Sequence, residues 1–449
     1  MTEIRDESPW QMHIAHLNYE MLDRSIAPDC VPLKVPVLTR PETEILPNGI
    51  ELTSFFHADQ NLISVELIFP ADDLSSKTRQ EEGYIFKLLA EGTKSKTSKQ
   101  VADAISFLGA SIDFSHQADI DTISISCLSR FLPSVLTILD ELWHSPVFPD
   151  KEWNTMKETQ HRQNDINLQK TSFLAGRLLR KSLYSTGLDY GYSYDQALVD
   201  SFSTEQFRNR FDQVRATGPG LVLLSGYADA AMQMQLRDWL LKFRNCRRVI
   251  RNREWTLPMP SAGIQWDERA DSQQSSLRIG QYAINSQHED SALFSLTLEL
   301  FGGYFGSRLM SNIREDKGWT YGIYAQRVPL VAKPHWVIGT DVKGDIILDA
   351  VEEIQKEARI LQNELVPDEE LKKVKNYMLG QFLSSVTNVY GLAERYRSMW
   401  VNGVDFERVE RNQRIIQEAG SIEVLGMAQK YLGLEDAVIA LSGKKMIKN

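Results

Sequence analysis

Alternation of apolar and polar residues predicts strands in both halves of the chain. Residues 61–69 and 121–127 alternate in the first half, and residues 276–280 and 335–339 do so in the second. A period of two is typical of strands that bury one face. We therefore expect each half to contain a sheet with one face on an apolar core.

A second pattern occurs once near the end of each half. Residues 221–226 (LVLLSG) and 438–443 (VIALSG) are apolar strands closed by Ser-Gly, 217 residues apart. Ahead of each strand, at residues 149–153 and 367–371, a Pro-Asp cap and acidic residues open a long helical stretch. Because strands and helices interleave in the same order twice, gene duplication is the simplest explanation. The predicted fold class is α+β, with two homologous domains and no solenoid.

A linker is expected where basic residues from Arg244 onward give way to a segment with two prolines and Gly263. The start of the chain has little periodicity and holds four prolines between residues 28 and 41, which favours an extended arm. The predicted organisation is given by four ranges: an arm at 1–44, an N-terminal domain at 45–243, a linker at 244–263 and a C-terminal domain at 264–449.

Composition and charge restrict the function. With 449 residues, 42% of them hydrophobic, the chain can bury two cores. A net charge of -10 without a basic stripe argues against a nucleic-acid partner. Cys30, Cys127 and Cys246 give no disulfide framework and suit a reducing compartment. The acidic start of the chain resembles neither a signal nor a transit peptide, so a cytoplasmic location without a membrane partner is expected.

The eight histidines do not form a zinc motif. None is followed by Glu three residues on and His four residues on, and Ala292 stands where a motif beginning at His288 would need its second His. His13 and His16 are three residues apart but have no further ligand at metal spacing. We therefore predict no metal site in this chain. Serine-nucleophile, phosphate-loop and dinucleotide motifs are also missing.

Residues 302–309 (GGYFGSRL), followed by residues 314–321 (REDKGWTY), carry a family resemblance. They resemble the second-half signature of the pitrilysin/insulinase-type zinc peptidases, the inverzincins. The similarity extends from about Leu46 to Gly443 and implies mainly antiparallel sheets packed with helices, which form half of a peptidase chamber.

The resemblance also implies roles for individual residues. Arg314 and Tyr321 would reach across the chamber to the substrate backbone and stabilise the oxyanion, a task suited to guanidinium and phenol donors. Four more residues are assigned to close packing at the chamber wall or to substrate binding: Gly302, Gly303, Ser307 and Arg308.

The first half contains the counterpart of the zinc-binding region. Gly92-Thr93 matches the pair that follows the zinc helix in active family members. Counting back from that pair, the positions of the first His, the Glu and the second His are held by Gly83, Phe86 and Lys87. The family's third ligand is a Glu on the next long helix, for which this chain offers Glu152 and Glu158. A missing side chain, an apolar ring and a cation cannot hold Zn²⁺, and one carboxylate cannot hold it alone.

A purely structural interpretation of the second-half signature is also available. Residues 305–316 fit an amphipathic helix that carries Arg314 on its solvated face and ends at Gly318. Tyr321 would then open a half-buried strand. This interpretation explains each residue type separately, but not why the whole string falls in the second half of a duplicated chain. We therefore favour the functional interpretation.

The predicted function is that of a zinc-free subunit of a heterodimeric metallopeptidase, inactive alone. A homologous partner bearing His-x-x-Glu-His would supply Zn²⁺ and the general base, while Arg314 and Tyr321 act in trans. Substrates would be short or unfolded peptides, held by strand addition to a sheet edge. This chain needs no cofactor of its own.

Two alternatives remain open. The chain could be a non-catalytic scaffold, like the core subunits of the respiratory cytochrome bc complex that share this fold, or a homodimeric peptide-binding clamp. Mutation of the Arg/Tyr pair would leave proteolysis unchanged if the chain is a scaffold. A clamp would bind peptide without a zinc-bearing partner.

Overall fold

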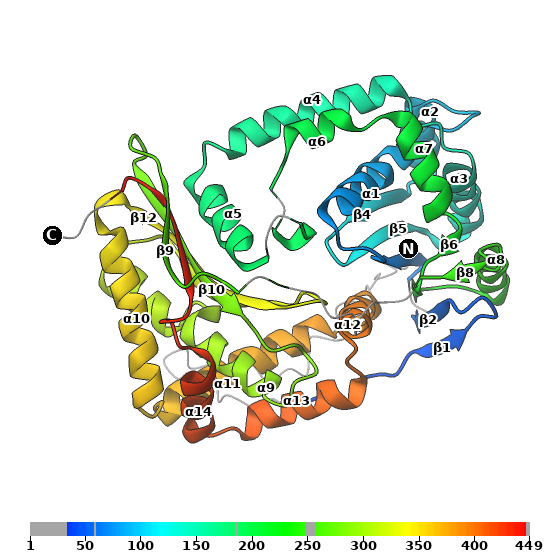
Figure 1. Ribbon diagram of the computed structural model, residues 1–449. Helices are drawn as coiled ribbons and strands as arrows, with labels where there is room; N and C mark the ends of the chain where they lie inside the picture. The colour runs from blue at the N-terminus through cyan, green and yellow to red at the C-terminus, as the bar shows by residue number, and fades with distance from the viewer. Residues whose placement is uncertain are drawn as a thin grey trace, which may run out of the picture. The chain divides into compact units, whose positions relative to one another are not determined.

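Two mixed sheets carry the fold, one from each half of the sequence (Figure 1). The computed structural model describes residues 34–57, 60–184, 187–191, 193–247, 257 and 259–445. The chain separates into a unit of residues 1–34 and a unit of residues 35–449, and all elements given below belong to the second unit. The expectations for His13, His16 and Cys30 lie outside the described residues.

The first sheet has the strand order β1-β2-β7-β3-β5-β4. Its strands are β1 (Glu42–Ile45), β2 (Glu51–Phe56), β3 (Leu62–Pro70), β4 (Ser111–His116), β5 (Ile120–Leu128) and β7 (Leu221–Gly226). The second sheet has the order β11-β12-β10-β13-β9. Its strands are β9 (Gly263–Glu268), β10 (Gln274–Tyr282), β11 (Ile323–Val328), β12 (His335–Lys343) and β13 (Val438–Gly443). A small separate sheet pairs β6 (Thr217–Gly218) with β8 (Asn245–Cys246).

The two large sheets repeat one topology. In the first sheet β2 and β7 are parallel, whereas β7-β3-β5-β4 are antiparallel. In the second sheet β9 and β13 are parallel, whereas β13-β10-β12-β11 are antiparallel. The sheets therefore match strand for strand, and β1 is an addition to the first. This match supports the duplication inferred from the sequence.

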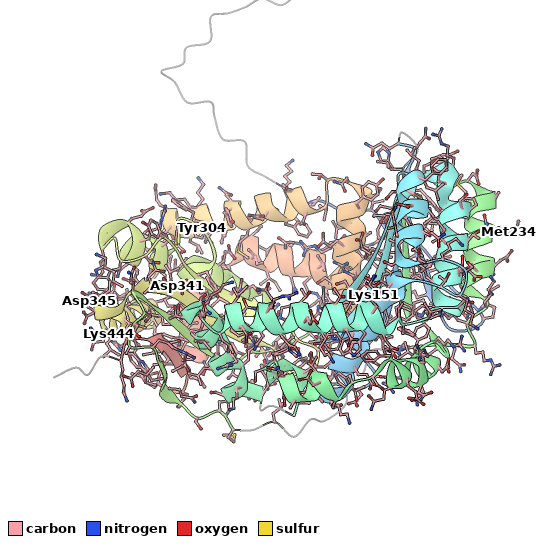
Figure 2. The ribbon with its side chains drawn as sticks, turned by 90° about the horizontal axis from the view of Figure 1, so that it is seen from above. Lys151, Met234, Tyr304, Asp341, Asp345 and Lys444 are labelled. Atoms are coloured by element: carbon pink, nitrogen blue, oxygen red, sulfur yellow. The ribbon has the colours of Figure 1, made fainter. Side chains whose placement is uncertain are left out.

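The helices alternate with these strands. The first half contains α1 (Ser76–Leu88), α2 (Ser98–Phe107), α3 (Leu132–His144), α4 (Asp150–Asn167), α5 (Thr171–Tyr184), α6 (Gln196–Ser201), α7 (Thr204–Val214) and α8 (Ala230–Leu240). The second half contains α9 (Ser291–Leu298), α10 (Ile347–Asn363), α11 (Asp368–Ser385), α12 (Val389–Asn402), α13 (Phe406–Glu418), α14 (Ser421–Tyr431) and π-helical segments at Glu299–Gly303 and Met310–Asp316. Figure 2 shows α4 from above, with Lys151 near its beginning.

The two predicted Pro-Asp helix starts are confirmed, but the capping differs. Helices α4 and α11 begin at Asp150 and Asp368. The residues before them, Pro149 and Pro367, occupy the N-cap positions, and no side chain makes a capping hydrogen bond at the N-terminus of either helix. The acidic first turns therefore act through the helix dipole and not through a cap.

Two helices are exchanged between the halves. Helix α5 of the first half packs on β10 and β13 of the second sheet, and α12 of the second half packs on β2 and β7 of the first sheet. Leu183 and Tyr184 of α5 share a buried cluster with Val438 and Ala440 of β13. The opposite faces of the two sheets pack on separate cores, one containing Phe86 and the other containing Phe301, Trp336 and their neighbours. The halves are thus joined by reciprocal apolar contacts.

The predicted α+β class is confirmed. Strand β1 begins at Glu42, inside the predicted arm, and β9 begins at Gly263, the last residue of the predicted linker. Residues 248–256 and 258 of that linker lie outside the described residues, so the domain boundaries stay predictions. None of the described helices combines the length and hydropathy needed to cross a bilayer.

Candidate functional site

The glycines of the second-half signature allow a close approach between a helix and a strand. A Cβ at Gly302 would lie 2.7 Å from Cβ and 2.8 Å from N of Ala325 on β11. A Cβ at Gly303 would lie 2.6 Å from the Glu299 carboxylate. Gly302 therefore lets the π-helical segment Glu299–Gly303, which continues α9, pack directly on β11, the strand that follows residues 314–321.

Arg314 lies on the π-helical segment Met310–Asp316. The regular helix starts at Arg308, not at Phe305 as the sequence pattern suggested. Ile313 faces the core, whereas Arg314 is partly exposed, and its guanidinium carbon lies 4.5 Å from the ring centroid of Phe305, a cation–π distance. Wide helical turns of this kind are rare and frequently occur at functional sites.

Tyr321 stands on a fixed loop with its side chain in solvent. Gly318, at φ +63°, ends the helix as predicted. The Thr320 hydroxyl lies 2.9 Å from the carbonyl oxygens of Gly322 and Asp341, which ties the loop to β12. Tyr321 is 94% exposed. The half-buried strand expected by the structural alternative is present, with Ile323 and Ala325 buried, but it begins at Ile323 and does not include Tyr321.

Ser307 is buried and Arg308 forms an ion pair within the chain. Ser307 is fully buried, and its Oγ has no hydrogen-bond partner among the described residues. Arg308 donates two hydrogen bonds to Glu370 of α11, at 2.8 and 3.0 Å. The rings of Tyr304, labelled in Figure 2, and Tyr377 lie 5.0 Å apart next to this pair. These contacts fasten the segment to α11, and the substrate-binding role of Ser307 and Arg308 stays a prediction.

The residues at the zinc position do not fit the metal. Phe86 is fully buried, with its ring centroid 5.7 Å from that of Phe69, and Lys87 is exposed. Of the two carboxylates considered for the third ligand, Glu158 is exposed and 3.9 Å from Arg162, and neither it nor Glu152 lines the cavity beside α1. In the described part of the chain, no three His, Cys, Asp or Glu side chains are grouped so that they could hold a metal ion.

The space of the first zinc ligand is taken by a histidine from another element. A Cβ at Gly83 would lie 2.6 Å from Cδ2 of His116 on β4. Nδ1 of His116 lies 2.5 Å from the buried carboxylate of Asp121. The imidazole therefore packs against the helix where the family's ligand would begin. No pattern in the sequence predicts this contact, because Gly83 and His116 are brought together only by the packing of α1 on β4.

A buried network of charges lies under α1. Arg79 is fully buried and contacts Glu82 at 2.6 Å and Asp121 at 2.9 Å. Glu82 also contacts Arg210 of α7 at 2.7 Å. Burial disfavours the charged form of Asp121, but the charges of Arg79 and His116 outweigh it and hold the pKa of that carboxyl below its usual value. Ion pairs thus link α1 to β5 and α7.

A cavity of about 270 Å³ opens beside α1 at the zinc position. Its walls come from α1, β4, α4, α5 and the residues before α6. It is lined by Gln80, Gly83, Tyr84, Lys87, His116, Gln160, Gln163, Asn164, Asn167, Phe173, Arg180, Ser193 and Tyr194. Amides of α4 therefore face the helix where the family has a carboxylate.

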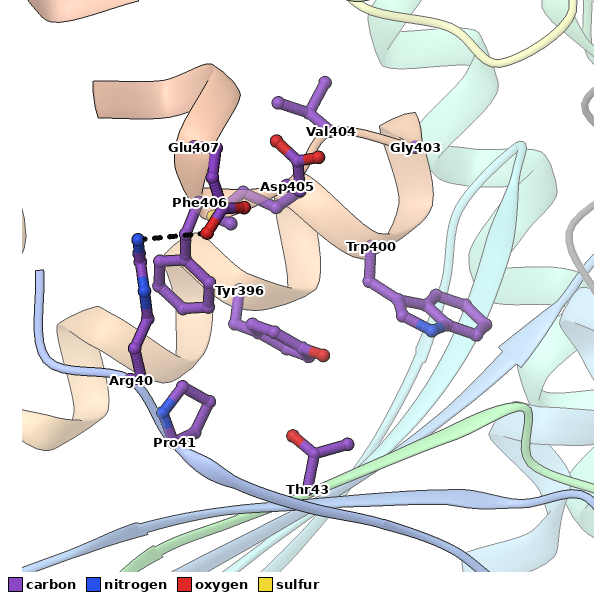
Figure 3. A pocket seen from close by; sticks show the side chains of 11 residues that line it. Arg40, Pro41, Thr43, Tyr396, Trp400, Gly403, Val404, Asp405, Phe406 and Glu407 are labelled. Atoms are coloured by element: carbon purple, nitrogen blue, oxygen red, sulfur yellow. Dashed lines mark hydrogen bonds and ion pairs between the residues drawn. The ribbon is translucent and has the colours of Figure 1, made fainter. Parts of the chain in front are cut away.

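Another cavity, of about 520 Å³, lies between residues 40–43, α12 and the start of α13 (Figure 3). Arg40 bridges its rim, 3.2 Å from Glu407 and with its guanidinium 4.5 Å from the Phe406 ring centroid. Tyr396 and Trp400 form an aromatic wall and both donate hydrogen bonds to Glu51. This cavity shares no lining residue with the one beside α1.

The fold and this site define a class: a duplicated α+β protein in which the residues at the position expected for a zinc motif cannot bind the metal. Comparisons with known proteins agree. Residues 244–378 match the family described as the peptidase M16 inactive domain. A Helicobacter pylori protein named "Non-peptidase homolog YmxG" is 22% identical over 92% of this chain and 92% of its own length. The "Uncharacterized zinc protease YmxG" of Bacillus subtilis is 18% identical, over 80% and 87% respectively.

A solved structure also matches the whole fold. The peptidase M16 inactive domain from Pseudomonas fluorescens superposes with a TM-score of 0.79 at 21% identity, covering 92% of this chain and all of the other. The resemblance inferred from the sequence is confirmed as a similarity: residues 244–378, which include Arg314 and Tyr321, match the peptidase M16 inactive domain, and the fold is shared over most of the chain.

Proposed function

We propose that this chain is the zinc-free subunit of a heterodimeric metallopeptidase. The observation that carries the proposal is the placement of Tyr321. A tyrosine that is 94% exposed on a firmly hydrogen-bonded loop is positioned to contact another molecule. The Arg314 guanidinium is partly exposed in the preceding helix. The zinc position, by contrast, is filled by residues that serve the fold.

In this proposal the two subunits divide the chemistry. A homologous partner bearing His-x-x-Glu-His supplies Zn²⁺ and the general base. Arg314 and Tyr321 donate hydrogen bonds to the substrate backbone and to the oxyanion of the tetrahedral intermediate. Substrates are short or unfolded peptides, and the complex works in the cytoplasm. Gly302 keeps the supporting helix close to β11, which fixes where residues 314–321 stand.

The test combines the purified chain with the His-x-x-Glu-His homologue encoded beside it. We expect the chain alone to be zinc-free and inactive, and the mixture to cleave peptides. Tyr321→Phe removes one oxyanion donor and should lower kcat by roughly 10²–10³. Tyr324→Phe is the matched control, because Tyr324 is also partly exposed but packs its ring on Gly339. An inactive mixture, or equal activity of the Tyr321→Phe and Tyr324→Phe complexes, would contradict the shared site.

A non-catalytic clamp or scaffold is the second candidate. It is favoured by the similarity over 92% of both chains to a relative described as a non-peptidase homologue. A clamp would bind unfolded peptide as a homodimer without any zinc-bearing partner. Sedimentation of the pure chain tests whether it forms the homodimer that a clamp needs. Turnover after mixing with the zinc-bearing homologue is expected only from the shared-site proposal, so the two measurements together separate the candidates.

A further inference from the structure

The cavity beside α1 has a positive lining. Lys87 and Arg180 contribute cations, and none of the lining residues is Asp or Glu. The nearby carboxylates of Glu82 and Asp121 are engaged by arginines in the network under α1. The position that corresponds to the family's zinc site is therefore lined by cations and amides in this chain.

Both cations lack strong partners within the part of the chain that the structure describes. No hydrogen bond or ion pair is formed there by the guanidinium of Arg180 or the ammonium of Lys87, although the charge of Asp189 acts on Arg180 from a distance. Lys87 Nζ lies 5.9 Å from the Tyr84 ring centroid. Desolvation, and then the charge of Arg177, lower the pKa of Arg180. An anion in the cavity would supply the countercharge that the described residues do not.

The remaining lining groups suit a carboxylate. Gln160, Gln163 and Asn164 carry amide N–H₂ donors on one side, and a guanidinium can hold both oxygens of a carboxylate at once. Nε2 of His116 is buried without a hydrogen-bond partner in the described residues. At about 270 Å³, the cavity is slightly smaller than the roughly 300–1,000 Å³ typical of pockets for drug-sized ligands. This size suits the end of a chain better than its middle.

We propose that the former zinc position is a carboxylate-binding pocket for the C-terminus of a peptide, with Arg180 and Lys87 as its charged anchors. The choice of a peptide as the ligand rests on the proposed function. The carboxylate itself follows from the cations and amides that line the cavity.

The experiment measures peptide binding to the pure chain, with no partner and no turnover. A fluorescent peptide is compared as the free acid, as the C-terminal amide, and as an amide carrying one acidic side chain at its last residue. Since hydrogen bonds to charged groups are the stronger ones, we expect the free acid to bind about tenfold or more tightly than the plain amide. Arg180→Met should abolish that difference.

Arg177→Met on the same helix is the matched control, because Arg177 does not line the cavity. It should keep the preference for the free acid. Lys87→Met, at an exposed position, provides a second variant that should weaken the preference without affecting folding. Circular dichroism of each variant shows whether it is folded.

Equal binding of acid and amide, or no binding of the free acid at millimolar concentration, would overturn the proposal. Equal effects of Arg180→Met and Arg177→Met would do the same. Tight binding of the amide with an acidic side chain would overturn the assignment to a chain terminus. None of these results depends on whether mixing with a partner creates peptidase activity, so the two proposals fail separately.

Discussion

Gly83→Ala tests whether His116 occupies the space of the first zinc ligand. The new Cβ would lie 2.6 Å from Cδ2 and 2.9 Å from Cγ and Nε2 of the imidazole, well inside the roughly 3.5–4.0 Å of a relaxed contact. The ring cannot easily move away, because Nδ1 is bonded to Asp121, which Arg79 holds in turn. The added methyl group must therefore distort the packing of α1 on β4.

The expected magnitude is the balance of two effects. Alanine favours a helix interior over glycine by about 1 kcal/mol, whereas overpacking in a tight core typically costs about 1–3 kcal/mol. With the imidazole held by a charge network, we expect a net loss of about 1–2 kcal/mol for Gly83→Ala. In a His116→Ala background the clash is gone, and the same change should stabilise by about 0.5–1 kcal/mol.

Urea unfolding at constant m-value measures these differences for the two single variants and the double variant. Gly380→Ala on α11 is the control, because no atom lies within 4 Å of the Cβ it would add, and it should be stabilising. If Gly83→Ala stabilises the chain as Gly380→Ala does, or shows no coupling to His116→Ala, the steric argument is refuted.

Two other predictions concern buried charge. Arg79→Met leaves Glu82 and Asp121 with only their remaining partners and should cost about 3–5 kcal/mol in urea unfolding. His335 is buried, and its Nδ1 lies 2.8 Å from the hydroxyl of Tyr184. Burial, and then the charge of Arg180, lower the pKa of His335 to about 4. Since the unfolded His has a pKa near 6.5, the unfolded state binds the proton first. Stability should fall by on the order of 3 kcal/mol from about pH 6.5 to 4, and His335→Gln should flatten that slope.

Each of these has a control that shares the residue type. Arg162→Met removes an exposed ion pair to Glu158 and should change stability by less than about 0.5 kcal/mol. His144→Gln, at an exposed position at the end of α3, is the matched substitution for the pH series. A small effect of Arg79→Met, or an unchanged slope in His335→Gln, would contradict the corresponding argument.

The sequence predicted the elements of the fold well because their signals are local. Residues 61–69 and 121–127 alternate, and they form β3 and β5 within one residue of the predicted bounds. Long helices begin at Asp150 and Asp368, as the Pro-Asp pattern indicated. The exchange of α5 and α12 could not be predicted, because an amphipathic pattern does not say which sheet a helix will cover.

The candidate site was predicted only in part, for the same reason. Phe86 and Lys87 could be excluded as zinc-site residues from residue type alone. That Asn164 on α4 lines the cavity, and that Glu158 does not, depends on the rotation of α4 about its axis. Tyr321 is two residues before β11 begins, a boundary too fine for periodicity to resolve, and that offset determines its exposure.

Introducing the zinc motif should not create zinc binding, because other side chains occupy the space that the motif would need. A His at position 83 would collide with the His116 ring before reaching any metal. A Glu at position 86 would place a carboxylate in a core formed by Phe69 and Trp143, where an unpaired charge is unfavourable. We therefore expect Gly83→His combined with Phe86→Glu and Lys87→His to be destabilised and zinc-free after dialysis, as measured by metal analysis. Stoichiometric zinc in a folded triple variant would show that the site had remained poised for the metal, and that the packing of His116 and Phe86 is incidental.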